Sequence, residues 1–259
     1  MSIKGFSTKV LHTPFPKEDP HGSIRMPVYD TAAFDFDDCD TLAAAFSGET
    51  KRHVYSRSSN PTVEYLEQVI KNVTGAKGAL CLSSGNAAIA NLVLSIVKTG
   101  DNIVTTKYLF GNTYSFFKNT LQSFGIEVKF IDLDNLVQLE KSIDEKTRCV
   151  FLESISNPHL KVFDFKRISA ITREKKVLLV ADTTLTPLCF FNAKEYGVDV
   201  EVISSTKYLS GGATSTGGGL IDHETYDWSC NPNLNNYKEK YGSSALMAKL
   251  RKESYRNMG

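Results

Sequence analysis

Short apolar runs alternate with amphipathic segments along most of the chain. Between 63 and 73, apolar residues stand at positions 63, 66, 69, 70 and 73, a spacing that predicts a helix. The run at 78–82 predicts a short buried strand. The same alternation predicts strands at 103–106, 126–131, 149–153, 177–182 and 198–204, and helices at 87–97, 113–124, 136–143 and 165–175. This order is typical of an α/β domain with a largely parallel sheet and helices on both faces.

Polar residues follow several of the predicted strands. Asp182 ends one strand, Lys207 comes shortly after the next, and Ser84 and Asn157 each follow a strand. Ligands of such sheets bind outside the carboxyl ends of the strands. We therefore expect these four residues to lie around a ligand site.

The first 60 residues lack this regular pattern. Pro14, Pro16, Pro20 and Pro27 interrupt them, and proline marks turns and irregular structure. We therefore expect residues 1–60 to form an irregular arm rather than a domain.

Composition and charge restrict the class of protein. With 259 residues, of which 41% are hydrophobic and 23% charged, the chain resembles a soluble globular protein. A net charge of +1 without a basic stripe argues against nucleic-acid binding. The longest apolar stretches are too short to span a bilayer, and the N-terminus lacks an apolar signal region. Because the five cysteines form no CxxC pair and the five histidines show no ligand spacing, we expect a reducing, cytoplasmic compartment and no metal site.

Lys207 and Asp182 suit the chemistry of pyridoxal phosphate (PLP). A lysine forms a Schiff base with the aldehyde, and a carboxylate keeps the pyridine nitrogen protonated, so that the ring withdraws electrons. A solvated lysine and an Asp that only caps a helix are the alternatives. The PLP interpretation is favoured because other segments of the chain agree with it.

Two further segments suit a phosphate group. Ser84, Gly85 and Asn86 join a strand to a helix, where small residues let backbone N–H groups approach a phosphate. An ordinary serine N-cap is the alternative for this segment. Ser204 and Thr206 flank the lysine at alternate positions, so their hydroxyls could reach the same phosphate.

Four more residues are candidates for cofactor contacts. Phe110 follows a strand and could stack on the pyridine ring, and Asn157 could donate to its phenolic oxygen. Tyr55 and Arg57 stand two apart in an extended segment and so point the same way, and Arg suits phosphate. The alternatives are core packing for Phe110, a plain turn for Asn157, and a solvated loop for Tyr55 and Arg57.

Taken in order along the chain, these segments resemble the Cys/Met-metabolism family of PLP enzymes, the trans-sulfuration group. The matching motifs are Y-x-R-x-x-N-P-T, S-G-x-A-A-I, F-G-N-T-Y, the N-P after Glu153, D-x-T and S-x-T-K-Y. Within the group the chain is most similar to the O-acetylhomoserine sulfhydrylases, through segments 5–12, 101–104, 125–128 and 226–228.

The resemblance implies the fold of type I PLP-dependent transferases, like that of aspartate aminotransferase, and a role for each motif residue. Lys207 would form the Schiff base, Asp182 would pair with the ring nitrogen, and Phe110 would stack on the ring. The remaining cofactor contacts would come from Ser84, Gly85, Asn86, Asn157, Thr184, Ser204 and Thr206. Tyr55 and Arg57 would reach the phosphate of a neighbouring subunit, so the active site would require a homodimer or homotetramer.

The implied reaction is γ-replacement on O-acetylhomoserine. Lys207, displaced from PLP by the amino acid, would move protons as a general base. Acetate would leave and sulfide or methanethiol would add, giving homocysteine or methionine. A methionine or homocysteine γ-lyase is the alternative with the same fold.

The sequence also departs from the family pattern. Phe110 replaces the usual Tyr, the segment 210–214 lacks the usual histidine, and Thr183 stands where the family has Asn. The chain is also shorter than family members, whose C-terminal domain supplies an arginine for the substrate carboxylate. We therefore expect residues 61–250 to form the PLP-binding large domain and residues 251–259 to begin a linker into a missing domain. A catalytically inactive remnant or a partner subunit is the second alternative function.

Overall fold

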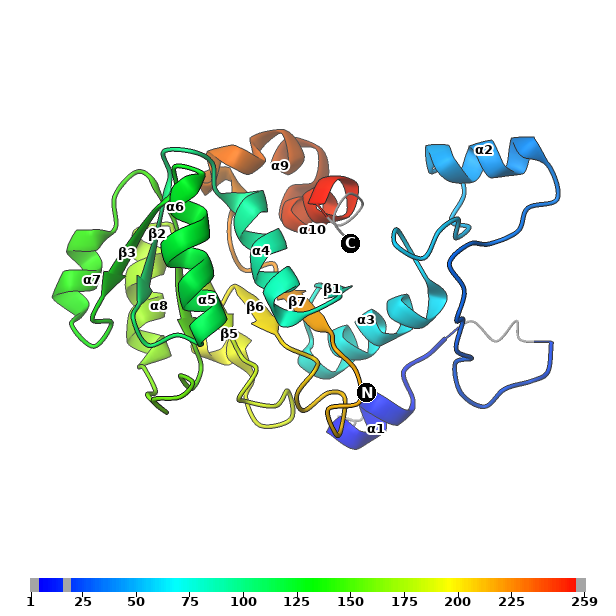
Figure 1. Ribbon diagram of the computed structural model, residues 1–259, viewed down its shortest axis with the longest axis horizontal. Coiled ribbons are helices and arrows are strands. Elements are labelled where there is room, and N and C mark those ends of the chain that lie inside the picture. Colours follow the sequence, from blue (N-terminus) through cyan, green and yellow to red (C-terminus); the bar gives the residue numbers. More distant parts are fainter. Residues whose placement is uncertain (1–4, 16–19, 255–259) are drawn as a thin grey trace.

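A seven-stranded mixed sheet forms the centre of the computed structural model, which describes residues 5–15 and 20–254 (Figure 1). The strand order is β1-β7-β6-β5-β4-β2-β3. The bounds are β1 Gly78–Leu82, β2 Asn102–Thr106, β3 Glu127–Ile131, β4 Thr147–Glu153, β5 Leu178–Asp182, β6 Val200–Ile203 and β7 Gly218–Asp222. The strands from β6 to β3 are parallel, whereas β7 is antiparallel to both β1 and β6. The predicted largely parallel sheet is confirmed.

The helices fall largely where the apolar spacing predicted them. The bounds are α1 Phe6–Leu11, α2 Cys39–Ser47, α3 Pro61–Thr74, α4 Gly85–Ile96, α5 Gly111–Ser115, α6 Leu121–Ser123, α7 Leu136–Ser142, α8 Phe165–Glu174, α9 Asn235–Tyr241 and α10 Ala245–Lys249. The helix predicted at 113–124 is a continuous helical segment in which a π-helical turn joins α5 to α6. Among the described residues, no helix is both long and apolar enough to cross a membrane.

Alternate residues of each strand point to opposite faces of the sheet, so the sheet separates two main cores. In β5, Leu178 and Val180 belong to the core that contains residues of α4, the α5–α6 segment and α10. Leu179 and Ala181 belong to the opposite core, which contains residues of α7 and α8. The central strands are therefore apolar on both faces, which explains their unbroken apolar runs in the sequence.

Strand β7 was not predicted, because its sequence begins with glycines and glycine is depleted in strands. The structure explains why glycine is required at Gly218. A Cβ atom there would lie 2.0 Å from the backbone oxygen of Ser84, so any side chain would collide with the turn that begins α4. This close approach places β7 directly behind that turn.

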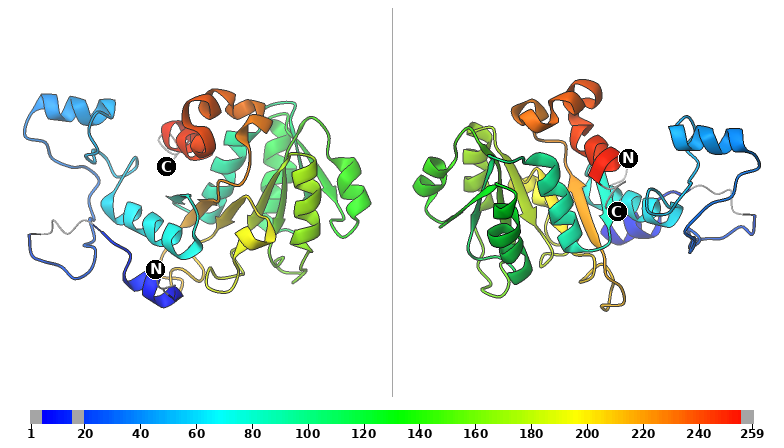
Figure 2. Two further views of the ribbon diagram at one scale, coloured as in Figure 1. Left: turned by 180° about the vertical axis from the view of Figure 1, so that it is seen from behind. Right: turned by 45° about the horizontal axis from the view of Figure 1, so that its top comes forward.

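The expectation of a wholly irregular arm was wrong in part. The first 60 residues include two helices, α1 and α2. Asp38 caps α2 by accepting from the Thr41 N–H at 2.7 Å, and Gly48 ends it in the left-handed conformation. These local signals act in a stretch without proline, because the prolines of the first 60 residues all lie at or before Pro27. The segment with α2 nevertheless projects away from the sheet and its helices in every view (Figures 1 and 2).

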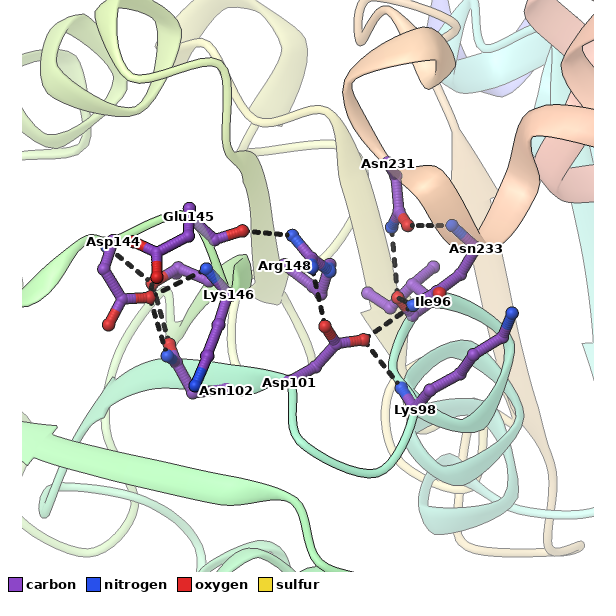
Figure 3. A network of polar contacts seen from close by, with 11 residues as sticks. Ile96, Lys98, Asp101, Asn102, Asp144, Glu145, Lys146, Arg148, Asn231 and Asn233 are labelled. Carbon is purple, nitrogen blue, oxygen red and sulfur yellow. Dashed lines mark hydrogen bonds and ion pairs between the residues drawn. The ribbon is translucent and has the colours of Figure 1, made fainter.

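A polar network fixes the C-terminal part of the chain to the rest of the sheet (Figure 3). The Asp101 carboxylate lies 2.6 Å from the Arg148 guanidinium, and it accepts a hydrogen bond from Asn233 Nδ2 at 2.7 Å. Asn231 and Asn233 both donate to the carbonyl oxygen of Ile96, at 3.1 and 3.0 Å. Since Ile96 ends α4, the network holds the residues that follow β7 against α4 and β2.

Candidate active site

A pocket of about 870 Å³ lies at the carboxyl ends of the parallel strands. It is lined by all of the expected cofactor-binding residues except Tyr55 and Arg57, namely Ser84, Gly85, Asn86, Phe110, Asn157, Asp182, Thr184, Ser204, Thr206 and Lys207. Its volume lies within the range of ordinary small-molecule sites. The structure therefore brings these predicted residues together, because the strand ends of a parallel sheet meet at one edge.

Asp182 ends β5 and lines this pocket. Its Oδ1 accepts a hydrogen bond from the Thr184 N–H at 2.9 Å, and Thr184 Oγ1 in turn accepts from the Ser204 N–H at 2.8 Å. Burial raises the pKa of the Asp182 carboxyl, while its bonds to Thr184 lower it. No ion pair within residues 5–15 and 20–254 neutralises this carboxylate, so a cation in the pocket would stabilise it.

The turn from β1 into α4 presents backbone N–H groups to the pocket. Ser84 is the N-cap of α4, and its Oγ accepts from the Ala87 N–H at 3.0 Å. The capping interpretation of Ser84 is thus confirmed, and it is compatible with anion binding, since a capped helix N-terminus still attracts negative charge. Gly85 packs closely on the loop that follows β6 and carries Lys207, called the lysine loop below, because a Cβ at Gly85 would lie 2.8 Å from the Cβ of Ser204.

Lys207 lies in the loop that follows β6, exposed along the wall of the pocket. Thr206 holds this loop in place: its Oγ1 donates to the Gly217 carbonyl at 3.1 Å and accepts from the Gly217 N–H at 3.0 Å. A phosphate would therefore compete with the Gly217 carbonyl for the one hydroxyl proton of Thr206. Ser204 has its own N–H bonded to Thr184, which ties the loop to the strand of Asp182.

Phe110 and Asn157 form part of the pocket wall from two different loops. Phe110 precedes α5, and its side chain is 42% exposed, so it is not the buried core residue that was the alternative. Asn157 follows β4. Both residues donate their backbone N–H to Glu153, one to each carboxylate oxygen, and the Asn157 bond measures 2.9 Å.

Glu153 is a pocket residue that the sequence-based reasoning missed. It ends β4, is 4% exposed, and pairs in the sheet register with Asp182 of β5. Burial and the nearby Asp182 carboxylate raise the pKa of Glu153 to about 7, against the two backbone N–H bonds that lower it. The available signal was a carboxylate at the end of an apolar run, in the strand next to Asp182. These acidic groups do not suggest a metal centre, since the described residues contain no group of three or more potential ligands.

Tyr55 and Arg57 do not line the pocket of Lys207. The Arg57 guanidinium lies 5.6 Å from the centre of the Tyr55 ring. Arg57 also lines a separate hollow with Ser205 and Gly217, on the flank of the lysine loop. That both residues act on a neighbouring subunit stays a prediction.

Comparison with known proteins shows the family of the chain. Residues 7–247 match the family described as Cys/Met metabolism PLP-dependent enzyme. The chain belongs to this family. The strands and helices that bear the pocket all lie inside the matched range, and the resemblance seen in the sequence motifs is confirmed.

Several known proteins are similar to this chain. Homocysteine/cysteine synthase of Saccharomyces cerevisiae is 35% identical over 98% of this chain and 61% of its own length. The structure of O-acetylhomoserine sulfhydrylase from Wolinella succinogenes superposes with a TM-score of 0.73 at 48% identity, over 79% of this chain and 60% of that one. A putative O-acetylhomoserine (thiol)-lyase from Campylobacter jejuni, which contains N'-pyridoxyl-lysine-5'-monophosphate, gives 0.81 at 34% identity, over 90% of this chain and 56% of that one. The chain thus spans about 60% of the length of such relatives.

The residues of this pocket fit PLP in type and position. A carboxylate without a cation partner among the described residues, Asp182, suits a protonated ring nitrogen. The N-terminus of α4, which begins at Gly85, suits a phosphate. Lys207 supplies an amine on the wall of the same pocket, and the half-exposed ring of Phe110 offers a flat apolar surface.

Proposed function

We propose that the protein binds PLP in this pocket and takes part in γ-replacement on O-acetylhomoserine with sulfide or methanethiol, giving homocysteine or methionine. When bound, PLP supplies an electron-withdrawing ring that makes the protons next to the amino group of a substrate labile. The observation that supports the proposal most is the convergence of Lys207, Asp182 and the N-terminus of α4 on one pocket.

Each group in the pocket has a distinct task in this proposal. Lys207 would hold the cofactor through its Nζ, and the same Nζ, when free, would move protons as a general base. The negative charge of Asp182 holds the ring nitrogen protonated. Phe110 would pack against the ring, and its side chain, which has no hydroxyl, could not carry a proton. The substrate-carboxylate arginine that the family resemblance implies is not assigned to any residue.

The phosphate would be held by hydrogen-bond donors and by a positive charge. The backbone N–H groups of Gly85 and Asn86 lie at the start of α4. This is the positive end of the helix dipole, which attracts a negatively charged group such as a phosphate. The hydroxyls of Ser84 and Ser204 add neutral donors from two neighbouring loops. Tyr55 and Arg57 of a second copy would add a cation, so we propose a homo-oligomer as the active form.

The first test is the visible absorption of the purified protein after incubation with PLP and desalting. We expect a retained absorption band in the wild-type protein, its loss in Lys207→Ala, and its retention in Lys194→Ala, a matched change at an exposed lysine outside the pocket. An equal band in Lys207→Ala would refute the assignment of the cofactor-bearing lysine.

The reaction itself is tested on the PLP-loaded protein with O-acetylhomoserine and sulfide. Formation of homocysteine would support the replacement reaction. Release of ammonia from methionine without added thiol would instead indicate γ-elimination by the same residues. A retained PLP band with neither product would support a non-catalytic role, for example as a partner subunit.

A further inference from the structure

One side chain connects the two loops that face the ring position of the pocket. Glu153 accepts the Phe110 N–H on Oε1 and the Asn157 N–H on Oε2, the latter at 2.9 Å. Phe110 lies in the loop after β2, and Asn157 lies in the loop after β4 itself. A single carboxylate therefore bridges these two walls of the pocket.

Core packing does not fix the position of the Phe110 ring. Its side chain is 42% exposed, so few neighbours restrain the ring directly. Glu153, by contrast, is 4% exposed and fixed at the end of a central strand. A hydrogen bond from a loop to a strand end of the sheet restrains that loop.

The chemistry of the site requires a carboxylate at this position. Both groups that face Glu153 are N–H donors, so the side chain between them must accept at two atoms. Glutamine has one acceptor oxygen and one NH₂ group, and its NH₂ would meet an N–H donor on one side. Aspartate has two oxygens but is one methylene shorter, so it cannot reach both loops from the same backbone position.

We propose that Glu153 is a positioning residue that sets the separation of Phe110 and Asn157, and so the slot in which the cofactor ring is held. This inference rests on the proposed binding of PLP. Glu153 itself stays bonded to the two loops and does not touch the reacting atoms.

The test compares Glu153→Gln and Glu153→Asp with a matched control, Glu67→Gln. Glu67 is also a buried carboxylate, 3% exposed, and it accepts a backbone N–H, from Cys81, at 2.9 Å. It pairs with Arg251 and does not line the pocket of Lys207. Its replacement therefore reproduces the loss of a buried carboxylate without affecting the two loops.

The first readout is amide hydrogen exchange of the PLP-free protein at Phe110 and Asn157. We expect Glu153→Gln to accelerate exchange at one or both amides about tenfold, the equivalent of one lost hydrogen bond. Glu153→Asp should do the same although it keeps the charge, whereas Glu67→Gln should leave both amides at the wild-type rate. Unchanged exchange in both Glu153 variants would overturn the proposal, and so would equal acceleration in the control.

The second readout is the affinity for PLP, measured by titration of the absorption band. Weakening of about tenfold in the Glu153 variants, with wild-type affinity in Glu67→Gln, is the expected result. Wild-type affinity in the Glu153 variants would overturn the proposal while leaving the proposed function intact. If the wild-type protein binds no PLP at all, the proposed function fails and this role of Glu153 fails with it, even if the exchange result stands.

Discussion

Gly218 does not line the pocket of Lys207, but its replacement with alanine should disrupt the phosphate end of that pocket. Gly218 lies in β7, and a Cβ there would be 2.0 Å from the Ser84 carbonyl oxygen and 2.8 Å from the Gly85 nitrogen. Both are backbone atoms of the turn that begins α4, so no flexible side chain can move aside. Because real Cβ contacts essentially never fall below 3.0 Å, the turn and β7 must move apart by at least 3.0 − 2.0 = 1.0 Å.

The expected consequences follow from that displacement. Overpacking of this kind destabilises a folded protein by about 1–3 kcal/mol. A shift of about 1 Å in a group that positions a ligand costs on the order of 10²-fold in function. We therefore expect Gly218→Ala to weaken PLP binding by about 10²-fold, since the N–H groups of the turn no longer face the phosphate.

The assay pairs PLP titration with urea unfolding, and Gly219→Ala serves as the control. A Cβ at Gly219 would meet only Ile203, at 2.9 Å from its Cγ1 and 3.1 Å from its Cδ1, and a side-chain rotation can relieve that contact. We expect Gly219→Ala to lose stability but to keep PLP affinity within about twofold, as its strain lies away from the α4 turn. The reasoning is refuted if Gly218→Ala binds PLP as tightly as the wild-type protein.

Two further predictions concern stability. Asp101→Ala leaves the Arg148 guanidinium, whose side chain is 12% exposed, without its carboxylate, and should lower the free energy of unfolding in urea by about 3–5 kcal/mol. Lys238→Ala breaks an exposed pair with Asp227 and should cost less than about 1 kcal/mol, and equal losses in the two variants would contradict the argument. Burial raises the pKa of Asp222 from 3.8 to about 7, so the folded protein retains a proton that the unfolded chain has released. Its contribution to stability is full below about pH 4 and is lost as the pH rises to about 7, so Asp222→Asn should flatten the measured stability over that window, and an unchanged slope would contradict this.

The sequence predicted the sheet and its helices where one physical signal dominated. Strands such as β5 are apolar on both faces, and helices such as α3 carry apolar residues at helical spacing, so pattern and structure agree. Strand β7 was not predicted because glycine weakens the strand signal, although the close approach of the Ser84 turn requires glycine there. That requirement comes from a contact across the fold, which no local pattern contains.

The same distinction applies to the candidate site. Asp182 and Lys207 were identified because their residue types and positions after strands are visible in the sequence. Glu153 was not, because its partners are backbone N–H groups of two loops, and any residue in those loops could provide them. The competition between phosphate and Gly217 for the Thr206 hydroxyl was equally invisible, since it depends on how the lysine loop folds back.

The residues proposed to bind the cofactor and those proposed to complete the active site come from different parts of the chain. The groups that face the ring and the phosphate come from strand ends and loops of one sheet, so folding of that sheet brings them together. Tyr55 and Arg57 instead belong to the segment before α3 and do not line the same pocket, although Arg57 lines a hollow beside it with Ser205 and Gly217. They can serve a cofactor in this pocket only through a second copy of the chain or a rearrangement of that segment. In the proposed function the sheet would therefore account for holding the cofactor, and the segment with Tyr55 and Arg57 is where assembly would act on its phosphate.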